Sequence, residues 1–265
     1  MEYWKYLSAS VPASKSGMSH MPFFVRDTVA LTCVFTMLYT VVPVIFKLSF
    51  TRWFYKLDKK KQEDFPAYAV CLIHHFLLVP RSWYHVIIDF TRGNNVIYDY
   101  GANEAIVAPI CVGYLLSDTI CYAINEVMTH NKYDYLIHHV CTLVLVMFTL
   151  MAEDGSICKF IPLLLLCDTT NIFFNSAWLL RLVPKYRDSK VVKILEVSFL
   201  FAFLFLRTIH MPCLFYAIYL TKREFLGVAQ HMLLPIVLMQ WYWTFLIIRG
   251  SVIRFFPKMD SNKKL

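Results

Sequence analysis

Residues 28–50 read TVALTCVFTMLYTVVPVIFKLSF and carry one charged side chain, Lys47. A helix needs about 20 mainly apolar residues to cross roughly 30 Å of hydrocarbon, so this run is long enough to span a bilayer. The pattern predicts an all-α polytopic membrane protein with about seven transmembrane helices. Six further apolar runs follow along the chain, at residues 67–90, 103–126, 135–152, 160–182, 191–220 and 225–252.

The composition also favours a membrane protein. Of the 265 residues, 58% are hydrophobic and 17% are charged, and the mean hydropathy is +0.52. A soluble domain of this size has too little interior to bury such an excess, so a soluble helical bundle is the weaker alternative. The eight cysteines fall almost entirely inside the apolar runs and form no Cys-x-x-Cys pair, and we interpret them as packing residues.

The basic residues lie in short segments between the apolar runs. Fifteen Lys and Arg side chains fall on one side of the expected membrane, and seven fall on the other side. By the positive-inside rule, the N-terminus is lumenal or extracellular and the C-terminus is cytosolic. Topology therefore explains the net charge of +8, and no nucleic-acid partner is expected.

This topology divides the chain into four parts. We expect a lumenal or extracellular N-terminal segment at residues 1–27 and the first transmembrane helix at residues 28–50. A six-helix membrane domain then occupies residues 51–253, and a cytosolic basic tail occupies residues 254–265.

Polar side chains inside the apolar runs mark the candidate site. Ionisable groups are costly in a bilayer, so they usually face the bundle interior or a water-filled cavity. Asp168, Asn171, Asn175 and Trp178 are separated by three, four and three residues, which places them on one helical face. We expect this polar stripe to point into a central polar cavity. The other candidates in the runs are His74, His75, Asp118, His138, His139, Thr142 and Arg207.

Depth and spacing indicate which of these side chains can meet. With a rise of about 1.5 Å per residue, His74, Asp118 and His139 lie roughly 8 to 12 Å from the predicted cytosolic side, so they can line one cavity. The adjacent His138 and His139 diverge by about 100° around the helix axis, and one of them is expected to face that cavity. Thr142 can share a face with either histidine.

Structural roles remain open for some of these residues. Arg207 can neutralise Asp168 or Glu196 inside the bundle, because charges in membranes commonly pair. The adjacent His74 and His75 can pack against other helices instead of lining a cavity.

Taken in order, these residues resemble the TLC-domain family of membrane proteins, which includes the ceramide synthases. The resemblance covers roughly Tyr55 to Ile253, most of the chain. The motifs that carry it are Gly113-Tyr114-Leu115-Leu116-Ser117-Asp118, His138-His139-Val140-Cys141-Thr142, the stretch from Asp168 through Asn175 to Trp178 and Arg181, and Phe205-Leu206-Arg207.

The chain departs from the ceramide synthase signature in one motif. The His-His-x-x-Thr element is present at His138, His139 and Thr142. The element His-Asp-x-x-Asp-x-x-x-Glu reads Cys167-Asp168-x-x-Asn171-x-x-x-Asn175 here, so its His, second Asp and Glu are replaced. The chain is therefore more similar to other branches of the family, which are associated with membrane lipid composition.

The resemblance implies acyl transfer from acyl-CoA, as co-substrate, to a lipid amine or hydroxyl. A neutral imidazole is suited to act as base or nucleophile near pH 7. The resemblance assigns that role to His138 or His139, with Asp168 or Asp118 as the orienting carboxylate, and implies no bound cofactor and no metal. The implied cavity-lining residues are His74, His75, Asp118, Thr142, Asn171, Asn175, Trp178 and Arg207.

A non-catalytic lipid-binding, lipid-sensing or lipid-trafficking protein is the main alternative, and the replaced Asp and Glu favour it. A seven-helix receptor would carry Asp-Arg-Tyr and Asn-Pro-x-x-Tyr signals, and a di-iron hydroxylase would carry clustered histidine motifs; the sequence has neither. The resemblance places the protein in the endoplasmic reticulum. Membrane lipids are the expected partners, and a homodimer stays open.

Overall fold

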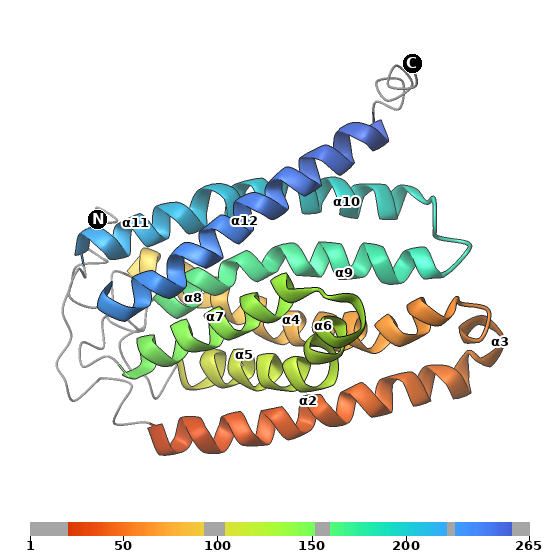
Figure 1. Ribbon diagram of the computed structural model, residues 1–265, viewed down its shortest axis with the longest axis horizontal. Helices are drawn as coiled ribbons and strands as arrows, with labels where there is room; N and C mark the ends of the chain where they lie inside the picture. The colour runs from red at the N-terminus through yellow and green to blue at the C-terminus, as the bar shows by residue number, and fades with distance from the viewer. Residues whose placement is uncertain (1–20, 93–103, 152–159, 222–225, 256–265) are drawn as a thin grey trace.

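The computed structural model describes residues 21–92, 104–151, 160–221 and 226–255, which fold into a bundle of helices without a β-strand in those ranges (Figure 1). The long helices run roughly along the longest axis of the molecule. In chain order the helices are α2 (Met21–Ser49), α3 (Thr51–Phe54), α4 (Lys59–Arg92), α5 (Glu104–Asp118), α6 (Ile124–His130), α7 (Tyr133–Met151), α8 (Phe160–Leu165), α9 (Thr169–Leu182), α10 (Lys190–Ala202), α11 (Met211–Thr221) and α12 (Leu226–Phe255).

Three of the predicted runs contain an irregular segment instead of one regular helix. The π-helical segment η4 (Thr119–Ala123) joins α5 to α6, and the π-helical segment η7 (Phe203–His210) joins α10 to α11. The 3₁₀ segment η6 (Leu166–Asp168) joins α8 to α9. Single π-helical turns inside helices are frequent at functional sites, and η4 and η7 lie beside two charged residues of the candidate site.

Three helices are long and apolar enough to cross a membrane within the described ranges: Phe24–Ser49, Val107–His130 and Phe160–Leu182. Tyr133–Thr149 is a shorter apolar helix. Large apolar side chains also cover the outside, since Met37, Phe76 and Phe201 are each more than half exposed, which is typical of a lipid-facing surface. These features are those of a multipass membrane protein, whereas the count of seven spans remains a prediction.

The ends of the chain differ in part from the predicted divisions. Helix α2 is longer than the predicted span and begins at Met21. Pro22 is compatible with its first turn, where backbone N–H groups have no helical partner. Residues 1–20 of the predicted N-terminal segment and residues 256–265 of the predicted tail lie outside the described residues.

Helix α2 packs closely along α5, and Gly113 lies at their contact. A Cβ atom on Gly113 would be 2.8 Å from Leu31 Cβ and 3.1 Å from the Thr32 backbone nitrogen. The glycine therefore permits a separation between the helices that a larger side chain would prevent.

Gly113→Leu is expected to destabilise the bundle by about 1 to 3 kcal/mol, because the added atoms overlap α2 and force the two helices apart. The thermal unfolding of the purified protein in detergent measures the change. Gly250→Leu in α12 is the matched control, because no atom lies within 4 Å of a Cβ at Gly250. Equal melting temperatures for the two variants would contradict the close packing at Gly113.

A cluster of charges fixes the start of α4 against α6. The carboxylate of Glu126, whose side chain is 3% exposed, accepts from Lys60 Nζ at 2.5 Å and from Lys132 Nζ at 2.7 Å. Burial lowers the pKa of Lys60, but its hydrogen bonds to Glu126 and Asp64 outweigh this effect and raise the pKa above its ordinary value. The cluster thus holds the start of α4 against α6 and against the connection that precedes α7.

Candidate functional site

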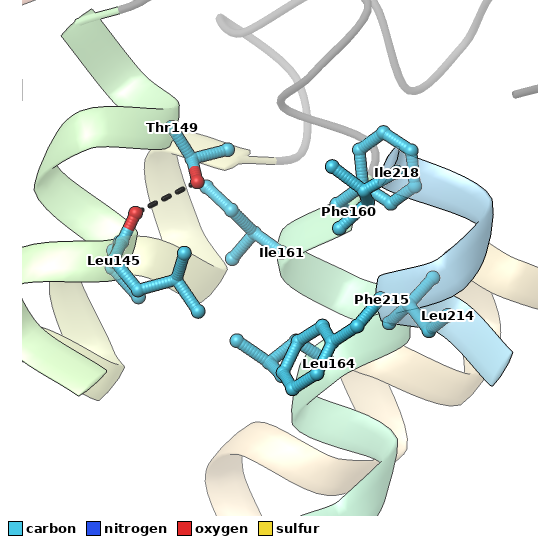
Figure 2. A pocket seen from close by; sticks show the side chains of 9 residues that line it. Leu145, Thr149, Phe160, Ile161, Leu164, Leu214, Phe215 and Ile218 are labelled. Atoms are coloured by element: carbon cyan, nitrogen blue, oxygen red, sulfur yellow. Dashed lines mark hydrogen bonds between the residues drawn. The ribbon is translucent and has the colours of Figure 1, made fainter. Parts of the chain in front are cut away.

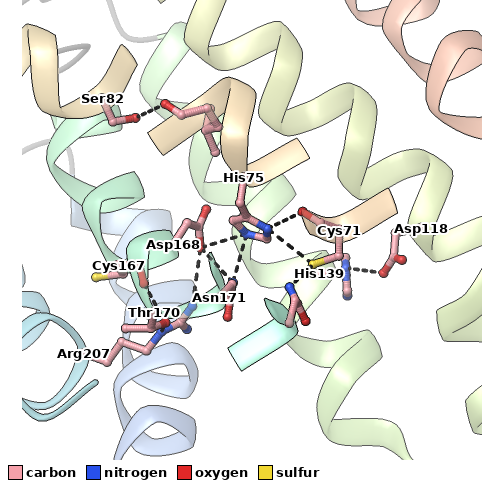
Figure 3. Close-up of polar contacts among 12 residues, drawn as sticks. Cys71, His75, Ser82, Asp118, His139, Cys167, Asp168, Thr170, Asn171 and Arg207 are labelled. Atoms are coloured by element: carbon pink, nitrogen blue, oxygen red, sulfur yellow. Dashed lines mark hydrogen bonds and ion pairs between the residues drawn. The ribbon is translucent and has the colours of Figure 1, made fainter. Parts of the chain in front are cut away.

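Arg207, in η7, is the centre of a buried polar network (Figure 3). Its side chain is 5% exposed, and each guanidinium nitrogen has a partner on another segment. Nε donates to Thr170 Oγ1 at 2.9 Å, one terminal nitrogen donates to Gln240 Oε1 at 3.2 Å, and the other lies 3.4 Å from Asp168 Oδ1. Arg207 therefore neutralises Asp168 and joins η7 to η6, α9 and α12.

The predicted polar stripe lies on the side of α9 that packs against α4. Asn171 Nδ2 is 3.0 Å from His75 Nε2 and 3.4 Å from Asp168 Oδ1, and Asn175 Nδ2 donates to Cys71 Sγ at 3.2 Å. One helical turn further on, Trp178 stacks on the ring of Tyr68, with centroids 3.9 Å apart. Side chains of α4 therefore oppose all four residues of the stripe.

Both ring nitrogens of His75 have partners in this network. Nε2 faces the Asn171 amide, while Nδ1 lies 2.5 Å from the carbonyl oxygen of Cys71. Because the carbonyl can only accept, Nδ1 carries the proton and Nε2 accepts from Asn171. Asp168 Oδ1 is 3.9 Å from Nε2. His75 is thus a neutral link between α4 and α9.

A second buried pair joins α5 to α7. His139 Nε2 lies 3.0 Å from Asp118 Oδ2, and the two side chains are 2% and 0% exposed. His139 Nδ1 lies 2.9 Å from the Tyr135 carbonyl oxygen and so carries a proton. The Tyr39 hydroxyl of α2 donates to the other oxygen of Asp118. The close approach of His139 and the contact with Tyr39 offset part of the cost of burying the Asp118 carboxylate.

The adjacent His138 has a different environment. Its ring is 5.9 Å from that of His139 and 5.4 Å from that of Trp243, a residue of α12. His138 Nδ1 is buried and has no hydrogen-bond partner. His138 can therefore still accept a proton or a ligand at Nδ1, whereas both nitrogens of His139 are occupied.

His74 lies between the two polar groups. Its ring stacks on Tyr114 with centroids 4.0 Å apart and contacts the ring of His75 at 4.6 Å. Both nitrogens of His74 and the hydroxyl of Tyr114 are buried without a partner. Buried polar atoms are nearly always paired, so unpaired ones call for water or a ligand. Thr142 is half-buried, and none of the described contacts joins it to either network.

A family model of the TLC domain matches residues 64–249, more than half of the chain. The chain belongs to the TLC-domain family. No curated protein and no solved structure matches it. The match extends from α4 to α12 and so includes His75, Asp118, His139, Asp168 and Arg207, whereas Tyr39 precedes it.

The TLC domain thus holds its predicted residues in two groups. His139 meets Asp118, whereas Asp168 meets Arg207, Asn171 and His75. Glu196, the other predicted partner for Arg207, instead forms an ion pair with Arg181. Within the described residues, no three His, Cys, Asp or Glu side chains are grouped so that they could hold a metal ion.

Sequence reasoning did not pair three polar residues with the partners that they have in the TLC-domain protein. Tyr39 lies in the first apolar run, Thr170 lies beside the stripe, and Gln240 is central in the last run. An uncharged amide in the middle of a long apolar run marks Gln240 as a polar group inside a span, but its contact with Arg207 cannot be predicted from spacing. Tyr39 and Thr170 resemble ordinary residues of membrane helices, and their roles depend on helix packing.

An apolar pocket lies apart from both polar groups, where α7, α8 and α11 meet (Figure 2). Its lining includes Leu145, Thr149, Phe160 and Phe215. The Thr149 hydroxyl donates a hydrogen bond to the Leu145 carbonyl oxygen. The volume of about 10 Å³ is the space of about one water molecule. This pocket is a packing gap and not a ligand site.

Proposed function

We propose that the protein acts in membrane lipid metabolism as an acyl-CoA-dependent acyltransferase, with His138 as its base and the His139–Asp118 pair as its support. The observation that carries this proposal is the buried and unpartnered Nδ1 of the half-buried His138, which lies beside the buried His139–Asp118 pair. Membership of the TLC-domain family supports a role connected with membrane lipids.

In the proposed reaction, His138 accepts the proton of a lipid hydroxyl or amine as that group attacks the carbonyl carbon of the acyl thioester. The new ester or amide bond forms, and the carbon–sulfur bond breaks. CoA leaves as a thiolate and receives the proton from His138, so the imidazole returns to its neutral form. No other reactant is needed.

Asp118 is preferred over Asp168 as the supporting carboxylate in this proposal. Asp118 lies 3.0 Å from His139, whereas Asp168 is engaged by Arg207 and Asn171. A carboxylate that is already paired with a guanidinium is a poor partner for a catalytic imidazole. We assign Asp168, Asn171 and Arg207 to the scaffold that holds α4, α9, η7 and α12 around the site.

Incubation of the purified protein with labelled acyl-CoA and mixed membrane lipids tests the proposal. A labelled lipid product is the expected result. Absence of a product across varied acyl chains and acceptor lipids would contradict it.

Lipid binding without catalysis is the second candidate function. It is favoured by the buried and unpartnered nitrogens of His74 and the hydroxyl of Tyr114, which a lipid headgroup can satisfy without any chemical step. A binder would retain a specific lipid through purification but form no labelled product.

We also propose seven spans, a lumenal N-terminus and a cytosolic C-terminus, with residence in the endoplasmic reticulum. Fifteen basic residues against seven in the loops support this orientation. In intact microsomes, protease should remove a C-terminal tag and leave an N-terminal tag protected. Cleavage of both tags in sealed vesicles would contradict an odd number of spans.

A further inference from the structure

A groove lies between α9, α10 and the last turns of α12, and it differs in character from the pocket described above. Its volume is about 250 Å³. Phe174, Trp178, Phe199 and Leu200 supply apolar and aromatic walls, while Arg181 and Glu196 supply charge. The groove is therefore amphipathic, as a site for a lipid with a polar headgroup must be.

The groove is separate from the histidine site. The residues that line it do not include His75, His139, Asp118, Asp168 or Arg207. On α12 the groove begins at Ile247, one helical turn beyond Trp243, the residue that His138 contacts. A molecule in the groove would thus lie beside the site without occupying it.

The charged end of the groove has no net charge. Arg181 and Glu196 form an ion pair, and their side chains are 39% and 19% exposed. Both side chains line the groove, so a ligand that offers both charges can exchange partners with this pair. An anionic ligand would be attracted by Arg181 and repelled by Glu196. The complementary headgroup is therefore a zwitterion.

The surroundings of Glu196 favour a quaternary ammonium as the positive group of that zwitterion. Phe199 follows Glu196 by three residues on α10, which places the two on neighbouring positions of one helical face. The rings of Phe199 and Phe174 are 5.2 Å apart. Aromatic faces beside a carboxylate attract cations that cannot donate hydrogen bonds.

The charged rim of the groove lies where α9 ends and α10 begins. Arg181 is in the last turn of α9, and α10 begins at Lys190 after a short connection, in which Ser189 caps the helix by accepting from the Val192 backbone N–H. The ends of two helices therefore flank the charged rim, while the aromatic walls continue toward the middle of the bundle.

We propose that this groove binds one phosphatidylcholine molecule. Its phosphate lies on Arg181, its quaternary ammonium lies on Glu196 beside the rings of Phe199 and Phe174, and an acyl chain lies along Trp178 and Leu200. This site goes beyond the proposed acyl transfer and does not depend on it.

Gly250 provides a substitution that fills the groove. No atom lies within 4 Å of a Cβ at this position, so Gly250→Phe places a ring in the groove without backbone strain. Val252→Phe is the matched control, because Val252 is 39% exposed on the same helix and does not line the groove. Equal melting temperatures in detergent show that both variants are folded.

Nanodiscs of equal phosphatidylcholine and phosphatidylglycerol provide the binding test. After extraction and detergent exchange, the retained lipids are measured by mass spectrometry. Wild type and Val252→Phe should retain phosphatidylcholine in preference to phosphatidylglycerol, and Gly250→Phe should retain about tenfold less, which corresponds to about 1.4 kcal/mol.

Glu196→Gln tests the charge argument independently. Loss of the carboxylate adds one unit of positive charge to this end of the groove, so retention should shift from phosphatidylcholine toward phosphatidylglycerol. Three results would each overturn the proposal: no lipid preference in the wild type, equal retention by Gly250→Phe and Val252→Phe, or an unchanged preference in Glu196→Gln.

Discussion

His138→Ala is expected to lower acyl transfer by about 10² to 10⁴-fold, the usual contribution of a general base. The variant loses the imidazole ring and its contacts with the rings of His139 and Trp243. The Nδ1 atom has no hydrogen-bond partner, so the bundle should still fold, and thermal unfolding in detergent checks this. Transfer of a labelled acyl chain to membrane lipids by purified protein measures the effect under single-turnover conditions.

Two further variants distinguish the base from its support. His139→Ala should lower transfer and also weaken the bundle, because it leaves the carboxylate of Asp118 without its partner at 3.0 Å. His85→Ala is the control, since His85 is a buried histidine outside both networks. Full activity in both His138→Ala and His139→Ala would exclude the catalytic proposal. A lipid binder would instead lose only about 1 to 2 kcal/mol of lipid affinity.

Arg207→Met is expected to destabilise the folded protein by about 3 to 5 kcal/mol, the usual cost of removing one partner from a buried ion pair. The methionine fills part of the space but leaves Asp168, Thr170 and Gln240 without their shared donor. Thermal unfolding in detergent, together with the amount of protein in the membrane, measures the loss.

The double variant Arg207→Met with Asp168→Asn provides the control for this prediction. Asparagine removes the uncompensated carboxylate, so the double variant should be more stable than Arg207→Met alone. If both variants are equally destabilised, the loss arises from packing and not from the charge of Asp168. That result would contradict the assigned role of Arg207.

Local periodicity predicted much of the site before the structure was considered. Asp168, Asn171, Asn175 and Trp178 share one side of their helix because a spacing of three or four residues returns to the same face. The residues that these side chains contact could not be predicted, because Cys71, His75 and Tyr68 come from α4, about 100 residues earlier. Contacts over that distance depend on how two helices dock and rotate.

The sequence by itself determined that this protein is helical, is apolar enough for a bilayer and belongs with TLC-domain proteins, because these properties depend on composition, run length and motif order. Only the tertiary structure decided that His139 meets Asp118 and that Arg207 meets Asp168. For Arg207 the physical reason lies partly in η7, the π-helical segment that contains it. A π-helical turn departs from the 3.6-residue period, so the direction of a side chain beyond it cannot be read from spacing. The partner of each buried charge is then set by the packing of the neighbouring helices.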